Sequence, residues 1–421
     1  MEYISSHKRF GVKSGLDRMK LIVEQSGIWE KICKIRFIHI AGTNGKGSAA
    51  SMCASVLSGA GYNTGLYVSP YVDEFTERIS VCGVRISEDD FARCIEFFLP
   101  YTESLDKERY GDFKEFELIT LAALKYFCDK ACKYVVFEVG IGGRLDATNI
   151  ILPYVSLIMS ISKDHEQQLG DTIRAIASEK CGIIKENVPC VCYPLQNAEA
   201  LVEIKHHAAS KNSKLYIPTL PENIKVTDEG TEFFYEGEHY KTSLLGVHQA
   251  YNCATVLKAF DVMRSLGVKI TKEQEKEGIL NLYHSARLEI LSKEPLVILD
   301  GAHNEGGFAA LSESIELLAK GKKRVFVMGM CTDHIKDEAL AKLIKKDDTI
   351  YVSQVKDNPR AASPEVLAKA LAPYSERVIC KESLTDALKA ALSGADKDTV
   401  TVCCGSLFIA TETKKYFSDT N

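Results

Sequence analysis

The stretch HIAGTNGKGSAA, residues 39–50, holds the residue types that bind a phosphate group at the start of a helix. Backbone N–H groups of the glycine-rich turn 42–45 converge on an anion, and the helix that follows adds the positive end of its dipole. Lys46 adds a full charge and Ser48 a hydroxyl. The generic pattern G-x-x-x-x-G-K-[ST] does not fit, because Gly47 separates the lysine from the serine. A chance glycine-rich turn is the alternative.

Several polar residues stand at or just after the ends of apolar, strand-like runs. They are Ser69, Glu138 and the pair Asp164 and His165. In open α/β sheets ligands bind beyond the carboxyl ends of the strands, and a carboxylate in an apolar run is costly unless it is paired or bound to a cation. The serine, the glutamate and the histidine can together hold Mg²⁺ against phosphates, although histidine is unusual for this ion. The alternative for each is a hydrogen-bonded loop residue.

Three further segments carry candidate residues. The polar, glycine-rich turn 142–149 is suited to meeting a substrate, although a plain connecting loop is the default interpretation. Lys180 stands on a helical segment and by itself indicates a solvated lysine. In LDGAHN, Asp300 at a strand end can accept hydrogen bonds from ribose hydroxyls, and His303 and Asn304 can reach a base or a phosphate.

Short apolar runs rich in β-formers alternate with helical patterns, which is typical of parallel α/β sheets. The expected strands are 36–41, 64–69, 134–139, 155–161, 296–300, 324–328, 349–355, 377–380 and 399–403. The expected helices are 87–101, 115–132, 172–184, 249–266 and 271–282. We therefore predict an α/β protein: a P-loop, parallel-sheet, ATP-binding domain over residues 1–290, with a small antiparallel subregion near 220–245, and a smaller Rossmann-like α/β domain over 291–421.

The bulk composition excludes several classes of protein. The chain has 421 residues, of which 46% are hydrophobic and 26% charged, with a formal net charge of −5. No basic block indicates nucleic-acid binding, and no apolar run indicates a signal peptide or a membrane span. The 14 scattered cysteines indicate reduced thiols rather than a disulfide framework. We expect a cytoplasmic protein without nucleic-acid or membrane partners.

As an ordered set, the motifs of this chain resemble the folylpolyglutamate synthase and dihydrofolate synthase family, relatives of the Mur ligases. The resemblance runs nearly end to end. It rests on SGLDRM, HIAGTNGKGS, VSPYVDEFTERIS, KEFELIT, FEVGIGGRLDATN, DHEQQLGDTIRAIASEKCGIIK, GVHQAYN, ARLE, LDGAHN, NPRAA and GSLFIA. The unusual phosphate loop also favours this branch of ATP-dependent ligases over ordinary kinases and GTPases.

The resemblance implies an ATP-dependent amide ligase. It would join the α-amino group of L-glutamate to a carboxylate of a pterin compound, either dihydropteroate or the glutamate tail of a folate. The carboxylate would attack the γ-phosphate of ATP to give an acyl phosphate, which the amine then attacks. ATP would lie between the domains, whose closure completes the site. The family is commonly monomeric, and we expect a monomer.

The resemblance also assigns roles to single residues. Those implied for the nucleotide are Gly42, Thr43, Asn44, Gly45, Lys46, Gly47, Ser48, Asn252, Arg287, Asp300 and His303. Ser69 and Glu138 would hold a first Mg²⁺ and His165 a second, which Lys180 would join if it is carbamylated as in relatives. Lys46, Lys180 and His165 are thus the implied catalytic residues. The implied substrate residues are Arg78, Arg144, Asp146, Arg360 and Ser406.

Five positions depart from the family pattern. Tyr71 replaces a histidine, Thr76 an asparagine, Ser162 and Lys163 a Gly-Leu pair, and Glu305 a proline. Tyr71 and Thr76 fall near the expected pterin and metal region, so the choice of acceptor stays open.

Two other functions are weighed against this one. A different ligase of the Mur type is disfavoured by LDGAHN and EVGIGGRLDATN. A non-catalytic nucleotide sensor is disfavoured because Lys46, Glu138 and Lys180 are all intact.

Overall fold

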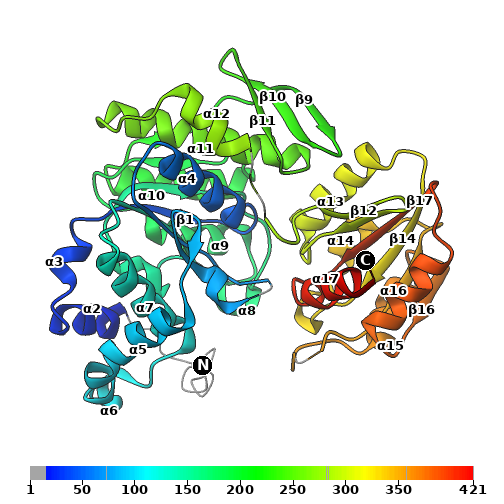
Figure 1. The fold of residues 1–421 in the computed structure, drawn as a ribbon, viewed down its shortest axis with the longest axis horizontal. Coiled ribbons are helices and arrows are strands. Elements are labelled where there is room, and N and C mark those ends of the chain that lie inside the picture. Colours follow the sequence, from blue (N-terminus) through cyan, green and yellow to red (C-terminus); the bar gives the residue numbers. More distant parts are fainter. Residues whose placement is uncertain (1–15, 73, 281, 283, 357, 421) are drawn as a thin grey trace. The chain divides into compact units, whose positions relative to one another are not determined.

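The computed structural model describes residues 16–72, 74–280, 282, 284–356 and 358–420 (Figure 1). They form two compact units. The N-terminal unit comprises the described parts of Met1–Ile161, His165–Leu220 and Tyr251–Leu280, and the C-terminal unit those of Ser162–Asp164, Pro221–Ala250 and Asn281–Asn421.

The N-terminal unit is built on an eight-stranded sheet in the order β4-β3-β2-β5-β1-β6-β7-β8. β2, β5, β6, β7 and β8 run parallel with β1, and β3 and β4 add an antiparallel edge. The strands are β1 (Arg36–Ala41), β2 (Thr64–Tyr67), β3 (Ile79–Val81), β4 (Val84–Arg85), β5 (Tyr134–Glu138), β6 (Pro153–Ile158), β7 (Cys190–Cys192) and β8 (Leu215–Tyr216).

Helices cover this sheet, whose two central strands are buried almost throughout. All of β5, and all of β1 except Arg36, is buried, as is usual where helices pack on both faces of a parallel sheet. The helices are α2 (Leu16–Gln25), α3 (Trp29–Ile32), α4 (Lys46–Gly59), α5 (Glu88–Glu103), α6 (Lys107–Tyr110), α7 (Glu115–Asp129), α8 (Glu166–Leu169), α9 (Ile173–Lys180), α10 (Ala198–Ser210), α11 (Val247–Ser265) and α12 (Lys272–Leu280). The part of α11 that belongs to this unit begins at Tyr251. One core joins Phe37 of β1 and Phe137 of β5 to residues of α2, α5 and α7.

The C-terminal unit holds a six-stranded sheet in the order β12-β13-β17-β14-β15-β16. Only β12 is antiparallel to its neighbour. The strands are β12 (Glu289–Lys293), β13 (Leu296–Leu299), β14 (Lys323–Met328), β15 (Thr349–Val352), β16 (Arg377–Cys380) and β17 (Thr399–Cys404). The helices are α13 (Glu305–Leu318), α14 (Asp337–Leu343), α15 (Pro364–Leu371), α16 (Leu384–Ser393) and α17 (Phe408–Thr420).

The predicted α/β class is confirmed, and each predicted strand and helix overlaps an observed one. The helix expected over 172–184 ends at Lys180 and passes into a 3₁₀ turn, Cys181–Ile183. The antiparallel subregion is the three-stranded sheet of β9 (Glu222–Thr227), β10 (Gly230–Tyr235) and β11 (Glu238–Thr242). Its residues group with the C-terminal unit, where β9 contacts α13, rather than with the domain in which the sequence placed them.

Candidate functional site

The phosphate loop connects β1 to α4, and two of its glycines are required by geometry. Gly42 has φ +155° and Gly45 φ +84°. A Cβ atom on Gly42 would lie 2.6 Å from Met159 Cβ, and one on Gly45 would lie 2.6 Å from Asn252 Oδ1. Asn252, on α11, therefore packs directly against the loop, and its role in nucleotide binding stays a prediction.

The loop is tied to the neighbouring strand. The backbone N–H groups of Thr43 and Asn44 both donate to the carbonyl oxygen of Ser160, just beyond β6, at 2.7 and 3.2 Å. Lys46 Nζ donates to the carbonyl oxygen of Thr43 at 3.2 Å, so its ammonium folds back over the loop. The amides of Thr43 and Asn44 therefore shape the loop, and no sequence pattern indicates the Ser160 carbonyl that accepts from them.

The start of α4 supplies the amides suited to an anion. The first hydrogen bond of the helix runs from Ala49 N to Gly45 O. The N–H groups of Lys46, Gly47 and Ser48 lie in the first turn of α4. In its first turn a helix offers backbone N–H donors and the positive end of its dipole. This turn and the lysine ammonium are the groups that could bind a phosphate, and the phosphate site stays a prediction.

Lys180 is buried at the end of α9 and points to the loop. Its side chain donates from Nζ to the carbonyl oxygen of Gly42 at 2.8 Å, and the residue is only 3% exposed. The interpretation of Lys180 as a solvated lysine is therefore wrong.

Ser69 and Glu138 meet where β2 and β5 end side by side. Ser69 N donates to Glu138 Oε2 at 3.2 Å, and Glu138 is 3% exposed. The structure thus brings the predicted metal-binding pair together. His165 lies farther along the chain, immediately before α8, with a backbone φ of +50°.

Asp146 points into the turn that follows β5. One carboxylate oxygen accepts from Gly140 N and Ile141 N at 3.0 Å each, and the other accepts from Thr148 N at 3.0 Å. Burial raises the pKa of Asp146, which the hydrogen bonds from Thr148 and the turn amides oppose. Thr148 Oγ1 also lies 2.9 Å from Nε2 of the buried His39, a neighbour that the sequence did not single out. The role of Asp146 seen in the structure is to hold the turn.

Two predicted substrate arginines of this unit have protein partners. Arg144 donates to Ser178 Oγ at 2.9 Å and forms an ion pair with Glu179 at 3.4 Å, which ties the turn to α9. Arg78 is buried, and its guanidinium carbon lies 5.1 Å from the centroid of the Tyr71 ring. Tyr71 thus acts as a platform for Arg78.

In the C-terminal unit the predicted nucleotide residues gather at the end of β13. The carboxylate of Asp300 accepts from Leu288 N and Ala302 N, both at 2.8 Å. Burial raises the pKa of Asp300, and the positive charge of Arg287 opposes this rise. His303 Nδ1 lies 2.8 Å from the carbonyl oxygen of Gly301.

The backbone around Arg287 is unusual. Its neighbours Ala286 and Leu288 have φ values of +54° and +49°, which residues other than glycine rarely adopt. A Cβ on Gly301 would lie 2.7 Å from Arg287 Nη1, so the guanidinium lies directly on the LDGAHN loop. Strained backbone of this kind is common at functional sites.

The two predicted substrate residues of the C-terminal unit lie in different surroundings. Ser406 is buried beyond β17, and its Oγ accepts from Phe408 N at 3.2 Å. Arg360 is more exposed and pairs with Asp333 at 3.1 Å.

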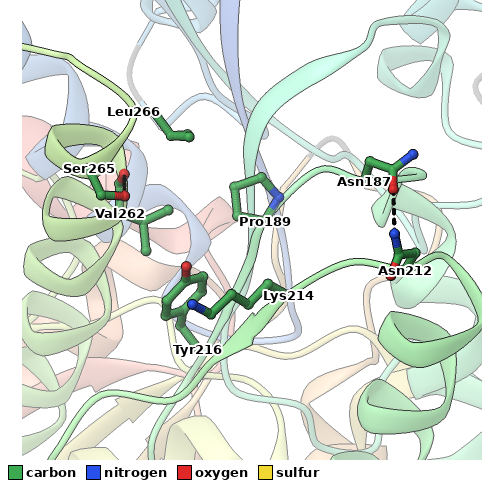
Figure 2. A pocket seen from close by; sticks show the side chains of 8 residues that line it. All are labelled: Asn187, Pro189, Asn212, Lys214, Tyr216, Val262, Ser265 and Leu266. Carbon is green, nitrogen blue, oxygen red and sulfur yellow. Dashed lines mark hydrogen bonds between the residues drawn. The ribbon is translucent and has the colours of Figure 1, made fainter.

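A separate cavity of about 320 Å³ lies on the N-terminal unit (Figure 2). Asn212 Nδ2 donates to Asn187 Oδ1 across its edge at 2.6 Å. Its lining consists of Asn187, Pro189, Asn212, Lys214, Tyr216, Val262, Ser265 and Leu266. None of the predicted site residues lines it.

Comparisons with known proteins agree with this arrangement. The Mur ligase middle domain matches residues 40–260, and the Mur ligase glutamate ligase domain matches residues 286–407. The dihydrofolate synthase/folylpolyglutamate synthase of Bacillus subtilis is 36% identical, covering 98% of this chain and 97% of that protein. The chain belongs to the folylpolyglutamate synthase and dihydrofolate synthase family. The family resemblance of the motifs is confirmed.

Solved structures of this family share the fold. Mycobacterium tuberculosis folylpolyglutamate synthase complexed with ADP superposes with a TM-score of 0.90 at 27% identity, covering 99% of this chain and 97% of that one. Escherichia coli FolC in complex with DHPP and ADP gives 0.84 at 28% identity, covering 100% and 97%. Like its relatives, this family member is an acid–amino-acid ligase that uses ATP. Among the residues the structure describes, no helix is both long and apolar enough to cross a membrane.

Proposed function

We propose that this protein adds L-glutamate to the glutamate tail of a folate, and also to dihydropteroate, with conversion of ATP to ADP and phosphate. The observation that carries the proposal is the contact of Lys180 Nζ with Gly42 O, 2.8 Å long, which brings a buried lysine to the phosphate loop. The names of the relatives cover both reactions and support both acceptors.

The chemistry proceeds in two steps. A carboxylate oxygen of the acceptor attacks the γ-phosphorus of ATP, the bond to the bridging oxygen breaks, and ADP leaves. The free α-amino group of glutamate then attacks the carbonyl carbon of the acyl phosphate; the carbon–oxygen bond to phosphate breaks and the nitrogen gives up a proton. Lys46 and the first turn of α4 stabilise the negative charge of the phosphates during the first step.

The residues near the loop fit magnesium. A carboxylate as buried as Glu138 needs donors or a cation, and with Ser69 it offers the oxygen ligands that Mg²⁺ prefers. Bound Mg²⁺ would neutralise phosphate charge. His165 and Lys180 would serve a second ion, provided that CO₂ bonds to the neutral amine of Lys180 and a proton leaves, so that the side chain becomes an anionic carbamate.

The other nucleotide residues take the roles that the family resemblance implies. Asn252 would meet the adenine base, and Arg287, Asp300 and His303 the rest of the nucleotide. Arg78, held on Tyr71, would face the acceptor.

The remaining substrate residues divide into two groups. Arg144 and Asp146 would act through the turn that they hold rather than by direct contact. Arg360 and Ser406 would bind glutamate. We further propose a monomer that works in the cytoplasm, where its 14 free cysteines stay reduced.

The test is ATP-dependent phosphate release with L-glutamate and Mg²⁺, comparing dihydropteroate, tetrahydrofolate and no acceptor. Turnover with both acceptors, each gaining one glutamate by mass spectrometry, is the expected result. Turnover with tetrahydrofolate alone would restrict the protein to polyglutamylation. Absence of turnover with both, from protein that still binds ATP, would overturn the proposal in favour of another acceptor of the Mur type.

A further inference from the structure

Helix α10 carries two imidazoles and a carboxylate on one side. Glu203, His206 and His207 occupy positions i, i+3 and i+4, which are neighbours on a helix surface. One ligand atom from each lies within 4.8 Å of the others. The ligase chemistry uses none of these residues, so their grouping requires a different explanation.

The spacing of two of these atoms already suits a metal ion. Glu203 Oε1 lies 3.2 Å from His207 Nε2. A tetrahedral zinc ion with bonds of about 2.1 Å holds neighbouring ligand atoms about 3.4 Å apart. His206 is exposed, and its ring centroid lies 5.8 Å from that of His207.

The cluster has a buried floor and an open side. The Glu203 side chain is 9% exposed and that of His207 21% exposed, while Ala200 and Ile204 of the same helix are part of the core. His206 is exposed. The cluster thus offers three protein ligands and is open to water on one side. Zinc sites that keep a water molecule as the fourth ligand have this arrangement.

His207 has a second hydrogen-bond partner besides Glu203. Ser178 Oγ also lies 3.2 Å from His207 Nε2, and a metal ion would displace this contact.

Among the described partners of Glu203, Arg174 is the one cation that would compete with a metal ion for the carboxylate. Its Nε lies 3.1 Å from Glu203 Oε2, on the oxygen away from His207. The arginine side chain is 73% exposed, and such surface pairs are weak. Glu203 Oε1 thus faces His207 rather than the arginine.

We propose that Glu203, His206 and His207 bind one divalent transition-metal ion of the zinc class. Two imidazoles and one carboxylate select Zn²⁺, Co²⁺, Ni²⁺ or Cu²⁺, whereas Mg²⁺ prefers oxygen ligands and retains its water. The site is therefore distinct in chemistry from the magnesium site of the ligase reaction, and millimolar Mg²⁺ does not fill it.

The test is a titration of the full-length, tag-free, chelator-treated protein with Co²⁺ in millimolar Mg²⁺, followed by the visible absorption of the bound ion. Competition between the protein and a chromophoric chelator for Zn²⁺ gives the affinity. The native protein should bind one equivalent of each ion. His206→Gln and His207→Gln should each weaken binding at least about tenfold, and Arg174→Gln should tighten it by removing the competing cation.

His239→Gln is the matched control, because His239 lies 3.7 Å from Glu232 but has no third ligand among the residues that the structure describes. It should leave the titration unchanged. Circular dichroism checks that each variant is folded, which His206→Gln should be since its side chain is exposed. A native protein that binds no Co²⁺, or a His206→Gln/His207→Gln double variant that keeps the native affinity, would overturn the proposal.

Discussion

Lys180 Nζ donates to the carbonyl oxygen of Gly42, so the last residue of α9 reaches the first residue of the phosphate loop. An ammonium buried there would repel metal ions bound at the phosphates, whereas a carbamate would attract them. The same contact therefore gives Lys180 either a structural role in shaping the loop or a role in holding metal.

Replacing Lys180 with methionine should separate the two roles. The apolar stem and its packing remain, but the loop contact and any carbamate are lost, so kcat should fall at least about a hundredfold. If the carbamate acts, added short carboxylic acids should restore part of the rate. Lys205→Met, on the exposed side of α10, is the control and should behave as the native enzyme. Lys180→Met with native kcat would rule out a catalytic role, and a slow variant without rescue would favour the structural one.

Gly45→Ala should damage nucleotide binding. The substitution places a Cβ 2.6 Å from Asn252 Oδ1 and puts alanine at φ +84°, a conformation that costs about 1–2 kcal/mol. We expect the Kd for ATP, measured by calorimetry, to rise at least about tenfold. Gly59→Ala is the matched control, because nothing lies within 4 Å of its added Cβ and its φ is not positive. It should leave the Kd unchanged, and an unchanged Kd in Gly45→Ala would contradict the predicted loop geometry.

The sequence predicted the elements better than the contacts between them. Continuous apolar runs are sufficient to identify β1 and β5, whereas β4 and β8 have only two residues each and no distinctive pattern. The approach of Asn252 to Gly45 depends on the packing of α11, which no local pattern encodes. Asp146 looked like a residue for substrate, but the direction of its side chain is set by the turn, which buries the carboxylate.

Tyr71 should affect the acceptor and not the nucleotide. Arg78 lies on its ring at 5.1 Å and on that of Phe75 at 5.8 Å, so Tyr71→Ala removes the nearer of the two rings that hold the guanidinium. We expect the KM for the pterin acceptor to rise about five- to tenfold, with the KM for ATP and kcat nearly unchanged. Tyr71→Phe keeps the ring and should stay within about twofold of the native enzyme. Equal losses for ATP and acceptor would show that the role of Tyr71 is general stability.

His39 should make the stability of the protein depend on acidity. Burial, helped by the positive charge of Lys185, lowers the pKa of this histidine from 6.5 to about 3. Below about pH 6.5, His39 therefore binds a proton in the unfolded chain but not in the folded protein. The free energy of unfolding should thus fall, from this group, by about 1.4 kcal/mol for each pH unit between about pH 6 and pH 4.

Urea unfolding at a series of pH values measures this dependence. His39→Gln removes the titrating group while its amide can still reach Thr148 Oγ1, so the slope should decrease by about 1.4 kcal/mol per pH unit, even if the variant is less stable overall. His248 and His284 also have pKa values lowered by burial, to about 4 and about 3, so part of the slope remains. His239→Gln, at an exposed position of β11, should leave the slope as it is in the native protein. If His39→Gln keeps the full native slope, the neutral, buried state of His39 is not what links folding to pH.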